Sequence, residues 1–364
     1  MKILVIGGNG YFGNKVAAAL RELPNATVSI ASRKPDAAAG EIKLDLNDAE
    51  TFGAMHGFNY IVNCSDALIA RPDKAMAYCL SNGLTFIETS DDAQTLLRLL
   101  QKYRDGVNDT AMTGQLLLGL GIMPGLSNLA AADLLRGRTG AQRIEVALKL
   151  NPLSGAGYGM SALSAQVVSN VAKRFENGEL ISDPPVWFSP QIPFAAGPMP
   201  ALRTGLPEAV MLHYSTRVPN TAAYLSLGPP VVGRALETAL FGMAMAFPRD
   251  PFFKPLAQSA LSQAFAGVRT VLFREGNTPF EIVAMVDRAD YFRHDGDSLS
   301  VQFSDGMLAA AYAVAAGVAA LAGQSNAPGV YLPDEVLTFD DVIARMREMA
   351  RERLKIVVKR TVIG

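Results

Sequence analysis

The sequence predicts an α/β protein with two parts: an N-terminal doubly wound parallel sheet and an inserted α/β domain with a mixed sheet. Three observations predict this class. Strand-like and helix-like runs alternate over residues 1–125, a glycine-rich turn directly follows the first strand, and the strands expected later are joined by longer, proline-rich connections. Alternation at this spacing is typical of βαβ units, whose crossover connections join parallel strands.

Short runs rich in apolar and β-branched residues indicate the strands of the first domain, residues 1–125. The expected strands are Lys2–Ile6, Thr27–Ala31, Glu41–Leu44, Tyr60–Asn63, Thr85–Glu88 and Gln115–Leu120. The segments between them have helix-like patterns. The expected helices are Asn14–Glu22, Ala49–His56, Asp73–Ser81 and Asp92–Tyr103.

Residues 126–304 are expected to form a domain that binds a small-molecule substrate and pairs with a second copy as a homodimer, because apolar strands with few charges predominate there. The expected elements are a helix at Leu126–Arg136 and strands at Arg143–Leu150, Ala209–Tyr214, Ala223–Leu227, Arg269–Arg274, Phe280–Asp287 and Ser298–Phe303. Three glycines predict a flexible loop over Asn151–Ser161.

Residues 305–364 are expected to return the chain to the first domain. The expected elements are helices at Asp305–Gly323 and Phe339–Leu354 and a final strand at Ile356–Ile363. Thr338 and Asp341 resemble an N-cap pair at the start of the second helix. The alanine-rich stretch Met307–Ala322 is shorter than the roughly 20 apolar residues of a membrane span. We therefore interpret it as a packed helix and expect no membrane contact.

Composition limits the classes of function. Hydrophobic residues make up 49% of the 364 residues and charged residues 18%, so the chain has enough apolar surface for a large core. The formal net charge of −1 provides no broad positive field, and we expect no nucleic-acid partner. The chain has only two cysteines, which favours reduced thiols in a cytoplasmic protein over a disulfide framework.

The strongest chemical signal is the turn Gly8-Asn9-Gly10-Tyr11-Phe12-Gly13, which fits G-x-G-x-x-G between the first strand and the first helix. In this pattern Gly8 permits the tight turn, Gly10 lets the backbone approach a pyrophosphate, and Gly13 lets the helix pack closely on the sheet. The unpaired amide groups at the helix N-terminus then bind the phosphates. The motif predicts a dinucleotide-binding Rossmann domain.

The end of the second strand indicates which dinucleotide binds. A site for NAD commonly has an acid there, but this chain has Ser32, Arg33 and Lys34, which suit the 2′-phosphate of NADP(H). Asp45-Leu46 follows the third strand, where an acid can meet the adenine amine. A basic solvated loop is the alternative interpretation of the two cations.

Residues after the later strands are expected to border the ribose and nicotinamide, because ligands of open parallel sheets lie beyond the carboxyl ends of the strands. Cys64 and Ser65 follow the fourth strand, and Cys64 is interpreted as a packed thiol rather than a nucleophile. Pro124 and Gly125 form a turn that brings backbone close to a flat ring. An ordinary strand-to-helix turn is the alternative.

With these motifs the sequence resembles the saccharopine dehydrogenase-like (saccharopine reductase-type) oxidoreductases. The resemblance is carried by GGNGYFG at the N-terminus, Gly119–Asn128 after the sixth strand, and GVYLPDE at Gly329–Glu335. It implies a Rossmann domain, an inserted α/β domain that often dimerises, NADP(H) or NAD(H), and hydride transfer to or from the imine or carbonyl carbon of an amino-acid-like substrate. Met123 stands where many saccharopine-forming members have an acid.

Candidate catalytic groups are sparse, and no metal site is expected. His213 is the leading acid–base candidate, near the end of an expected strand, and Tyr158 is a possible donor in the glycine-rich loop. Arg203, Arg217 and Arg269 are candidates for orienting a substrate carboxylate. Two alternatives stay open: an atypical short-chain dehydrogenase/reductase, and an NADP(H)-binding sensor without turnover.

Overall fold

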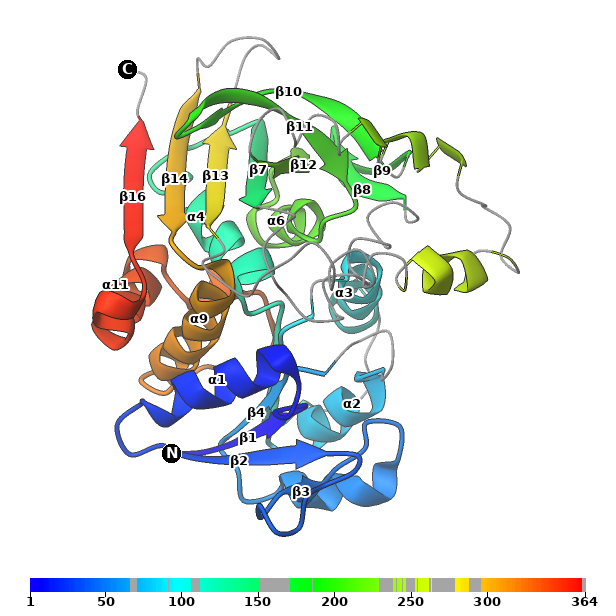
Figure 1. Ribbon diagram of the computed structural model, residues 1–364, viewed down its shortest axis with the longest axis vertical. Coiled ribbons are helices and arrows are strands. Elements are labelled where there is room, and N and C mark those ends of the chain that lie inside the picture. The colour runs from blue at the N-terminus through cyan, green and yellow to red at the C-terminus, as the bar shows by residue number, and fades with distance from the viewer. Residues whose placement is uncertain are drawn as a thin grey trace. The chain divides into compact units, whose positions relative to one another are not determined.

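The computed structural model (Figure 1) divides into two compact units, Met1–Leu129 with Met307–Arg353, and Ala130–Gly306 with Leu354–Gly364. It describes residues 1–65, 71–90, 92–105, 112–150, 171–184, 186–228, 238–239, 241–243, 245–246, 253, 255–261, 263, 279–287 and 296–361. The expected loop Asn151–Ser161 and the expected strand Arg269–Arg274 lie outside these residues.

The first unit contains a seven-stranded parallel sheet in the order β15-β6-β5-β4-β1-β2-β3. Its strands are β1 Lys2–Ile6, β2 Thr27–Ser32, β3 Ile42–Lys43, β4 Tyr60–Asn63, β5 Thr85–Glu88, β6 Gln115–Leu118 and β15 Gly329–Tyr331. The first six were all expected, and each lies within two residues of the expected bounds at both ends. The strand at Gly329–Tyr331 was not among the expected elements, and it pairs in parallel with β6.

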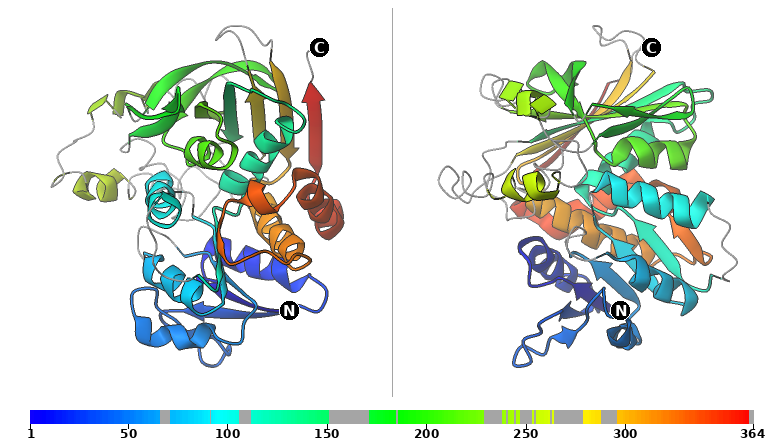
Figure 2. Two further views of the ribbon diagram at one scale, coloured as in Figure 1. Left: turned by 180° about the vertical axis from the view of Figure 1, so that it is seen from behind. Right: turned by 90° about the vertical axis from the view of Figure 1, so that its right-hand side faces the viewer.

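Helices cover both faces of this sheet (Figure 2). The helices of this unit include α1 Tyr11–Arg21, η1 Ala49–Met55, α2 Asp73–Ser81, α3 Ala93–Leu100, η2 Gln101–Asp105, α9 Gly306–Leu321, α10 Pro333–Val336, α11 Phe339–Ala350 and η4 Arg351–Arg353. The chain moves outward from β1 to β2 and in the opposite direction from β4 to β5. Right-handed crossovers therefore place α1 and α2 on opposite faces.

The helix α9 is the alanine-rich segment of the sequence, and its side chains from Ala309 to Ala316 are buried. The Tyr312 hydroxyl in α9 donates to the carboxylate of Glu22, to which Arg353 also donates two hydrogen bonds of 2.8 and 2.6 Å. These contacts join the end of α1 to α9 and η4 within the first unit. No helix among the described residues combines the length and the apolar character that crossing a bilayer requires.

The second unit contains a mixed nine-stranded sheet whose main path runs β10-β11-β12-β7-β13-β14-β16, with β8 and β9 attached through β12. The elements are α4 Ser127–Leu134, which begins in the first unit, β7 Arg143–Leu150, β8 Ala172–Glu176, β9 Glu179–Asp183, β10 Val186–Phe194, β11 Gly197–Thr204, α6 Glu208–Thr216, β12 Asn220–Leu227, β13 Phe280–Val286, β14 Asp297–Phe303 and β16 Ile356–Thr361. Only β7 and β12 pair in parallel among these strands. The last strand, β16, pairs antiparallel with β14 and so belongs to the second sheet.

The expected strand at Ala209–Tyr214 is wrong, because these residues lie in helix α6. The run Ala209–Leu212 is buried throughout, so it lacks the polar side that would distinguish a helix from a buried strand. Pro207 lies at the N-cap of this helix, where its missing amide hydrogen costs nothing.

Two hairpins in the second unit were not expected. The sequence of β10 and β11 contains four prolines, which argue against strands. In the structure β10 is an edge strand, and its register shifts between Phe188 and Gln191, where Pro190 lies. Edges and bulges are the places where a sheet accepts proline. The turn between β8 and β9 contains Asn177 and Gly178 with φ of 52° and 81°, the Asn-Gly pair typical of two-residue hairpins.

Candidate nucleotide site in the first unit

The strand order of the first sheet creates a switch point between β1 and β4, because the chain builds β2 and β3 on one side and β5 and β6 on the other. The order 3-2-1-4-5-6 is that of dinucleotide-binding sheets. The register pairs Ile6 with Asn63 and Asn63 with Glu88. Residues that follow these strands therefore lie along one edge of the sheet, where ligands of such sheets bind.

The glycine turn lies at this switch point, and a Cβ at Gly7, Gly8 or Gly13 would be crowded by neighbouring atoms. Gly7 has φ of 75° and donates its amide to the Ala31 carbonyl at 2.9 Å, while the Gly10 amide donates to the Gly7 carbonyl at 2.9 Å. A Cβ at Gly13 would overlap the Gly7 carbonyl, and one at Gly8 would lie 2.9 Å from the Ile30 side chain. The tight-turn residue with positive φ is thus Gly7 rather than the expected Gly8.

Helix α1 begins at this turn without a capping side chain, since Gly10 is its N-cap. The first amide groups of a helix have no intrahelical acceptor and attract anions. Tyr11 is 42% exposed, so the entrance to the helix is accessible to a ligand. The turn thus offers free backbone, close approach and a positive helix end at one place, as a diphosphate requires.

An acid that was not among the expected site residues, Glu41, lies beside the end of β2. Ser32 is partly buried, and Arg33 and Lys34 are exposed, as their expected role requires. Beside them, one carboxylate oxygen of Glu41 accepts from Asn9 Nδ2 at 2.8 Å and from Ser32 Oγ at 3.4 Å. A turn that begins near Asp36 and ends just before β3 returns Glu41 to β2. The only sequence signals of this return are a proline and a glycine within the intervening segment.

Asp45 and Leu46, expected near the adenine, follow β3. The Asp45 carboxylate accepts from the Asn47 amide at 2.9 Å, and the Asp45 backbone forms hydrogen bonds with the Thr51 hydroxyl. Leu46 is 2% exposed and packs in the core. Asp45 therefore shapes a local turn, and the Leu46 side chain is committed to the interior of the unit.

A buried polar network joins the ends of β4 and β5. The Glu88 carboxylate, fully buried, accepts from Asn63 Nδ2 at 2.8 Å and from the Ser90 amide at 2.9 Å. Asn63 Oδ1 in turn accepts from the Ser65 hydroxyl at 2.6 Å. This chain of hydrogen bonds fixes Ser65 at the edge where a nicotinamide ribose is expected. Burial raises the pKa of the Cys64 thiol to about 12, so the thiol stays protonated at neutral pH.

The turn that follows β6 is attached to the same network. The amides of Gly119 and Leu120 both donate to the Glu88 carbonyl at 2.9 Å. Gly125 has φ of 118°, and a Cβ there would lie 2.9 Å from the Gly119 carbonyl oxygen. Pro124 and Gly125 are buried, so this segment is a tightly closed turn at the carboxyl edge of the sheet.

The catalytic candidates of the second unit have structural contacts. His213 lies in α6 rather than at a strand end, its Nδ1 is 3.0 Å from the Val218 carbonyl oxygen, and its ring stacks on Phe175 at 3.6 Å. Arg203 lies 3.1 Å from Asp183. Arg217 lies at the end of α6, and the candidates Tyr158 and Arg269 lie outside the described residues.

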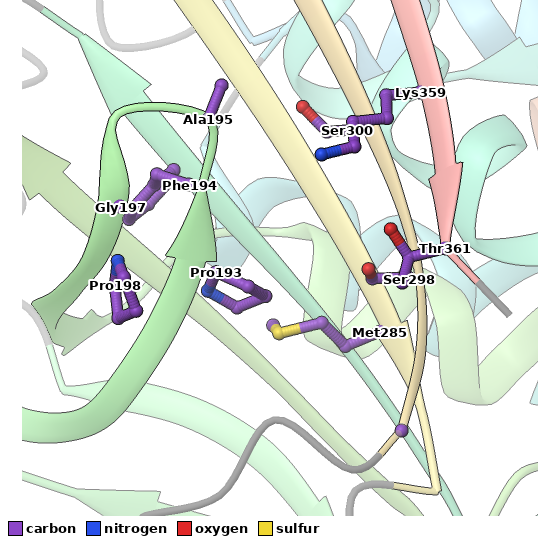
Figure 3. Close-up of a pocket in the computed structure, with 11 residues that line it drawn as sticks. Pro193, Phe194, Ala195, Gly197, Pro198, Met285, Ser298, Ser300, Lys359 and Thr361 are labelled. Carbon is purple, nitrogen blue, oxygen red and sulfur yellow. The ribbon is translucent and has the colours of Figure 1, made fainter. Parts of the chain in front are cut away.

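The second unit contains a cavity of about 210 Å³ between the β10–β11 hairpin and strands β13, β14 and β16. Figure 3 shows Phe194 and Pro198 on the hairpin side and Ser298, Ser300 and Lys359 on the sheet side. Beside it, the buried Glu281 carboxylate accepts from the Ala195 amide at 2.8 Å and from the Ser300 hydroxyl at 3.0 Å. Among the described residues, no three His, Cys, Asp or Glu side chains gather as a metal site would require.

Comparison with models of protein families and with curated proteins finds no match. Solved structures to which this chain is similar include a myo-inositol dehydrogenase from Corynebacterium glutamicum, 12% identical, covering 98% of each chain with a TM-score of 0.42. The C. glutamicum DAP dehydrogenase in complex with DAP is 11% identical and covers 95% of this chain and 98% of its own, with a TM-score of 0.46. The WlbA dehydrogenase from Thermus thermophilus in complex with NAD and UDP-GlcNAcA is 14% identical and covers 97% and 94%, with a TM-score of 0.36. At these levels of similarity, none of them determines what this chain binds.

Proposed function

We propose that this protein is an NADP(H)-dependent oxidoreductase that transfers a hydride to or from an imine or carbonyl carbon of an amino-acid-like substrate. The observation that carries the proposal is the glycine turn between β1 and α1. It admits no Cβ at Gly13, opens an uncapped helix at Gly10, and lies at the switch point of a 3-2-1-4-5-6 sheet. These three properties together suit a dinucleotide diphosphate.

The described residues fit each part of such a cofactor. The amides at the start of α1 would hold the diphosphate, and the Ser32 hydroxyl and the exposed cations Arg33 and Lys34 would hold a 2′-phosphate. Ser65, oriented through Asn63, would meet the nicotinamide ribose. When bound, the nicotinamide supplies or accepts the hydride.

The protein's own part in the reaction is to bind and orient. Gly125 has no side chain, and in this proposal the backbone of the Pro124–Gly125 turn packs against the planar nicotinamide ring. The Glu88–Asn63–Ser65 chain holds a hydroxyl in one orientation, because each acceptor in it is engaged by a donor. A buried network of this kind keeps its geometry without rearrangement when a ligand binds.

The substrate class rests on the sequence. The resemblance of Gly119–Asn128 and Gly329–Glu335 to the saccharopine dehydrogenase-like oxidoreductases supports an amino-acid-like substrate with an imine or carbonyl carbon. We also propose a homodimer formed through the second unit, and a cytoplasmic location, with which the two free cysteines agree. Light scattering at micromolar concentration tests the dimer.

Calorimetric titration of the purified chain with NADPH and NADH tests the proposal, with Gly13→Ala and Gly53→Ala as a matched pair. A Cβ at Gly13 overlaps the Gly7 carbonyl, whereas one at Gly53 meets nothing within 4 Å. We expect Gly13→Ala to abolish binding and Gly53→Ala to preserve it. Absence of binding of either dinucleotide to the wild-type chain refutes the proposal. Binding followed by no NADPH oxidation with a panel of amines and 2-oxo acids would favour the sensor.

A further inference from the structure

We propose that Glu41 sets the preference between NADP(H) and NAD(H), by competing with a 2′-phosphate for the donors at the end of β2 and by accepting from a 2′-hydroxyl instead. The inference rests on the proposed dinucleotide site and adds a residue that the glycine motif and the basic loop do not include. It predicts that the chain binds both dinucleotides. It also predicts that Glu41 lowers the affinity for NADP(H) relative to the affinity that Arg33 and Lys34 would give without it.

The evidence is the set of donors around one carboxylate oxygen. Oε2 of Glu41 accepts from Asn9 Nδ2 at 2.8 Å, from the Asp36 amide at 2.8 Å and from Ser32 Oγ at 3.4 Å. These donors come from the glycine turn, from the segment after β2 and from the end of β2. They surround the place where a dinucleotide-binding sheet holds the 2′ substituent of the adenosine ribose.

The backbone, rather than a single side-chain rotamer, brings Glu41 to this place. The Asp36 carboxylate accepts from the amides of Ala38 and Ala39 at 2.9 and 3.4 Å, and the Glu41 amide donates to the Asp36 carbonyl at 3.1 Å. Gly40, with φ of 69°, completes the turn. The following residues then enter β3, which is paired in parallel with β2.

The chemistry of the donors makes Glu41 a competitor of phosphate. An amide N–H₂, a hydroxyl and a backbone N–H are the groups that bind a phosphate oxygen, and here a carboxylate already accepts from all three. A dianionic phosphate beside that carboxylate would be repelled, whereas a ribose hydroxyl can donate to it. The exposed cations Arg33 and Lys34 attract the phosphate, so the balance between them and Glu41 decides the preference.

A purely structural role makes a different prediction. If Glu41 only fastens the 36–41 turn to the glycine loop, its loss loosens the whole site and weakens both dinucleotides by a similar factor. Competition changes the two affinities in opposite directions. The ratio of the two dissociation constants therefore separates the roles, and it does not depend on the substrate or on turnover.

The test is a fluorescence titration of NADPH and NADH into the wild-type chain, Glu41→Gln, Glu41→Ala and the control Glu348→Gln, an exposed acid in α11. Glutamine keeps an acceptor oxygen for the turn but removes the charge. We expect both Glu41 variants to bind NADPH more tightly and NADH more weakly, and to shift the ratio by roughly tenfold or more, within the usual range of coupling between sites. The control should leave the ratio unchanged.

Each outcome bears on one of the two proposals. An unchanged ratio in both Glu41 variants, with both dinucleotides still bound by the wild-type chain, overturns the role of Glu41 and leaves the proposed function intact. Failure of the wild-type chain to bind either dinucleotide refutes the proposed function itself. Circular dichroism confirms folding, and if Glu41→Ala does not fold, the near-isosteric Glu41→Gln still decides.

Discussion

Replacing Glu88 with glutamine removes one of two acceptors in the buried network between β4 and β5. The carboxylate accepts from Asn63 Nδ2 on one oxygen and from the Ser90 amide on the other, and both Glu88 and Asn63 are fully buried. A glutamine offers one oxygen and one amino group, so it satisfies one donor and faces the other with a donor of its own. Leaving one buried donor unsatisfied costs about 1–3 kcal/mol.

The same geometry predicts a rescue. Asn63→Asp alone sets a second carboxylate against Glu88 and destabilises the unit, because one of the two must take up a proton or repel the other. Combined with Glu88→Gln, it restores the hydrogen bond between positions 63 and 88 with the donor and acceptor exchanged. The new amide at position 88 donates to the new carboxylate at position 63, which still accepts from the Ser65 hydroxyl, while the new amide oxygen accepts from the Ser90 amide.

Urea unfolding of the wild-type chain, both single variants and the double variant measures this cycle. We expect the double variant to recover at least 1 kcal/mol relative to the sum of the single losses, since the two positions are in direct contact. Glu348→Gln on the exposed face of α11 should change the free energy of unfolding by less than about 0.5 kcal/mol. Losses that simply add would refute the assignment of donors and acceptors.

Four further outcomes follow from individual contacts. Burial, and next the Glu22 carboxylate, raise the pKa of Tyr312 from 10.0 to about 12. Because the folded state holds this proton more tightly than the unfolded state, the free energy of unfolding should fall as the pH rises from 10 to 12. Tyr312→Phe should reduce this slope in unfolding experiments at several pH values. Burial raises the pKa of the Cys79 thiol to about 12, so iodoacetamide at pH 8 should label Cys79 only in unfolded chains, as peptide mass spectrometry would show. Glu281→Ala should cost about 1–3 kcal/mol in urea unfolding, because it removes the oxygen that accepts from the Ala195 amide and the Ser300 hydroxyl beside the β10–β11 hairpin. Arg33→Asp should weaken NADPH far more than NADH in calorimetry, and equal weakening would count against a 2′-phosphate contact.

The sequence predicts those parts of the fold in which local pattern and burial agree. The strands β1, β4 and β5 and the helix α2 are confirmed at both ends, because short apolar runs alternate there with helical segments in a parallel sheet. The N-cap of α11 is also confirmed, since Thr338 accepts from the Asp341 amide. Such features depend on residues a few positions apart.

The features that the sequence did not predict depend on tertiary position. The prolines of β10 and β11 are acceptable only because β10 is an edge and its ladder is interrupted, which no local pattern shows. Glu41 lies 32 residues after Asn9, and the two side chains meet at 2.8 Å because β2 pairs with β1 and the turn over residues 36–41 returns the chain to the end of β2. The sequence gives the residue types of the nucleotide loop, but the acceptor in it is apparent only in three dimensions.

The chain crosses between the two units three times, after residues 129, 306 and 353. During synthesis, a nascent chain that ends at residue 306 would leave β6 without β15 and β14 without β16. Unpaired strand edges are templates for association with other chains. Both sheets are therefore completed only after most of the polypeptide has left the ribosome. If residues 1–306 were made without the rest of the chain, the edges of β6 and β14 would lack the strands that cover them.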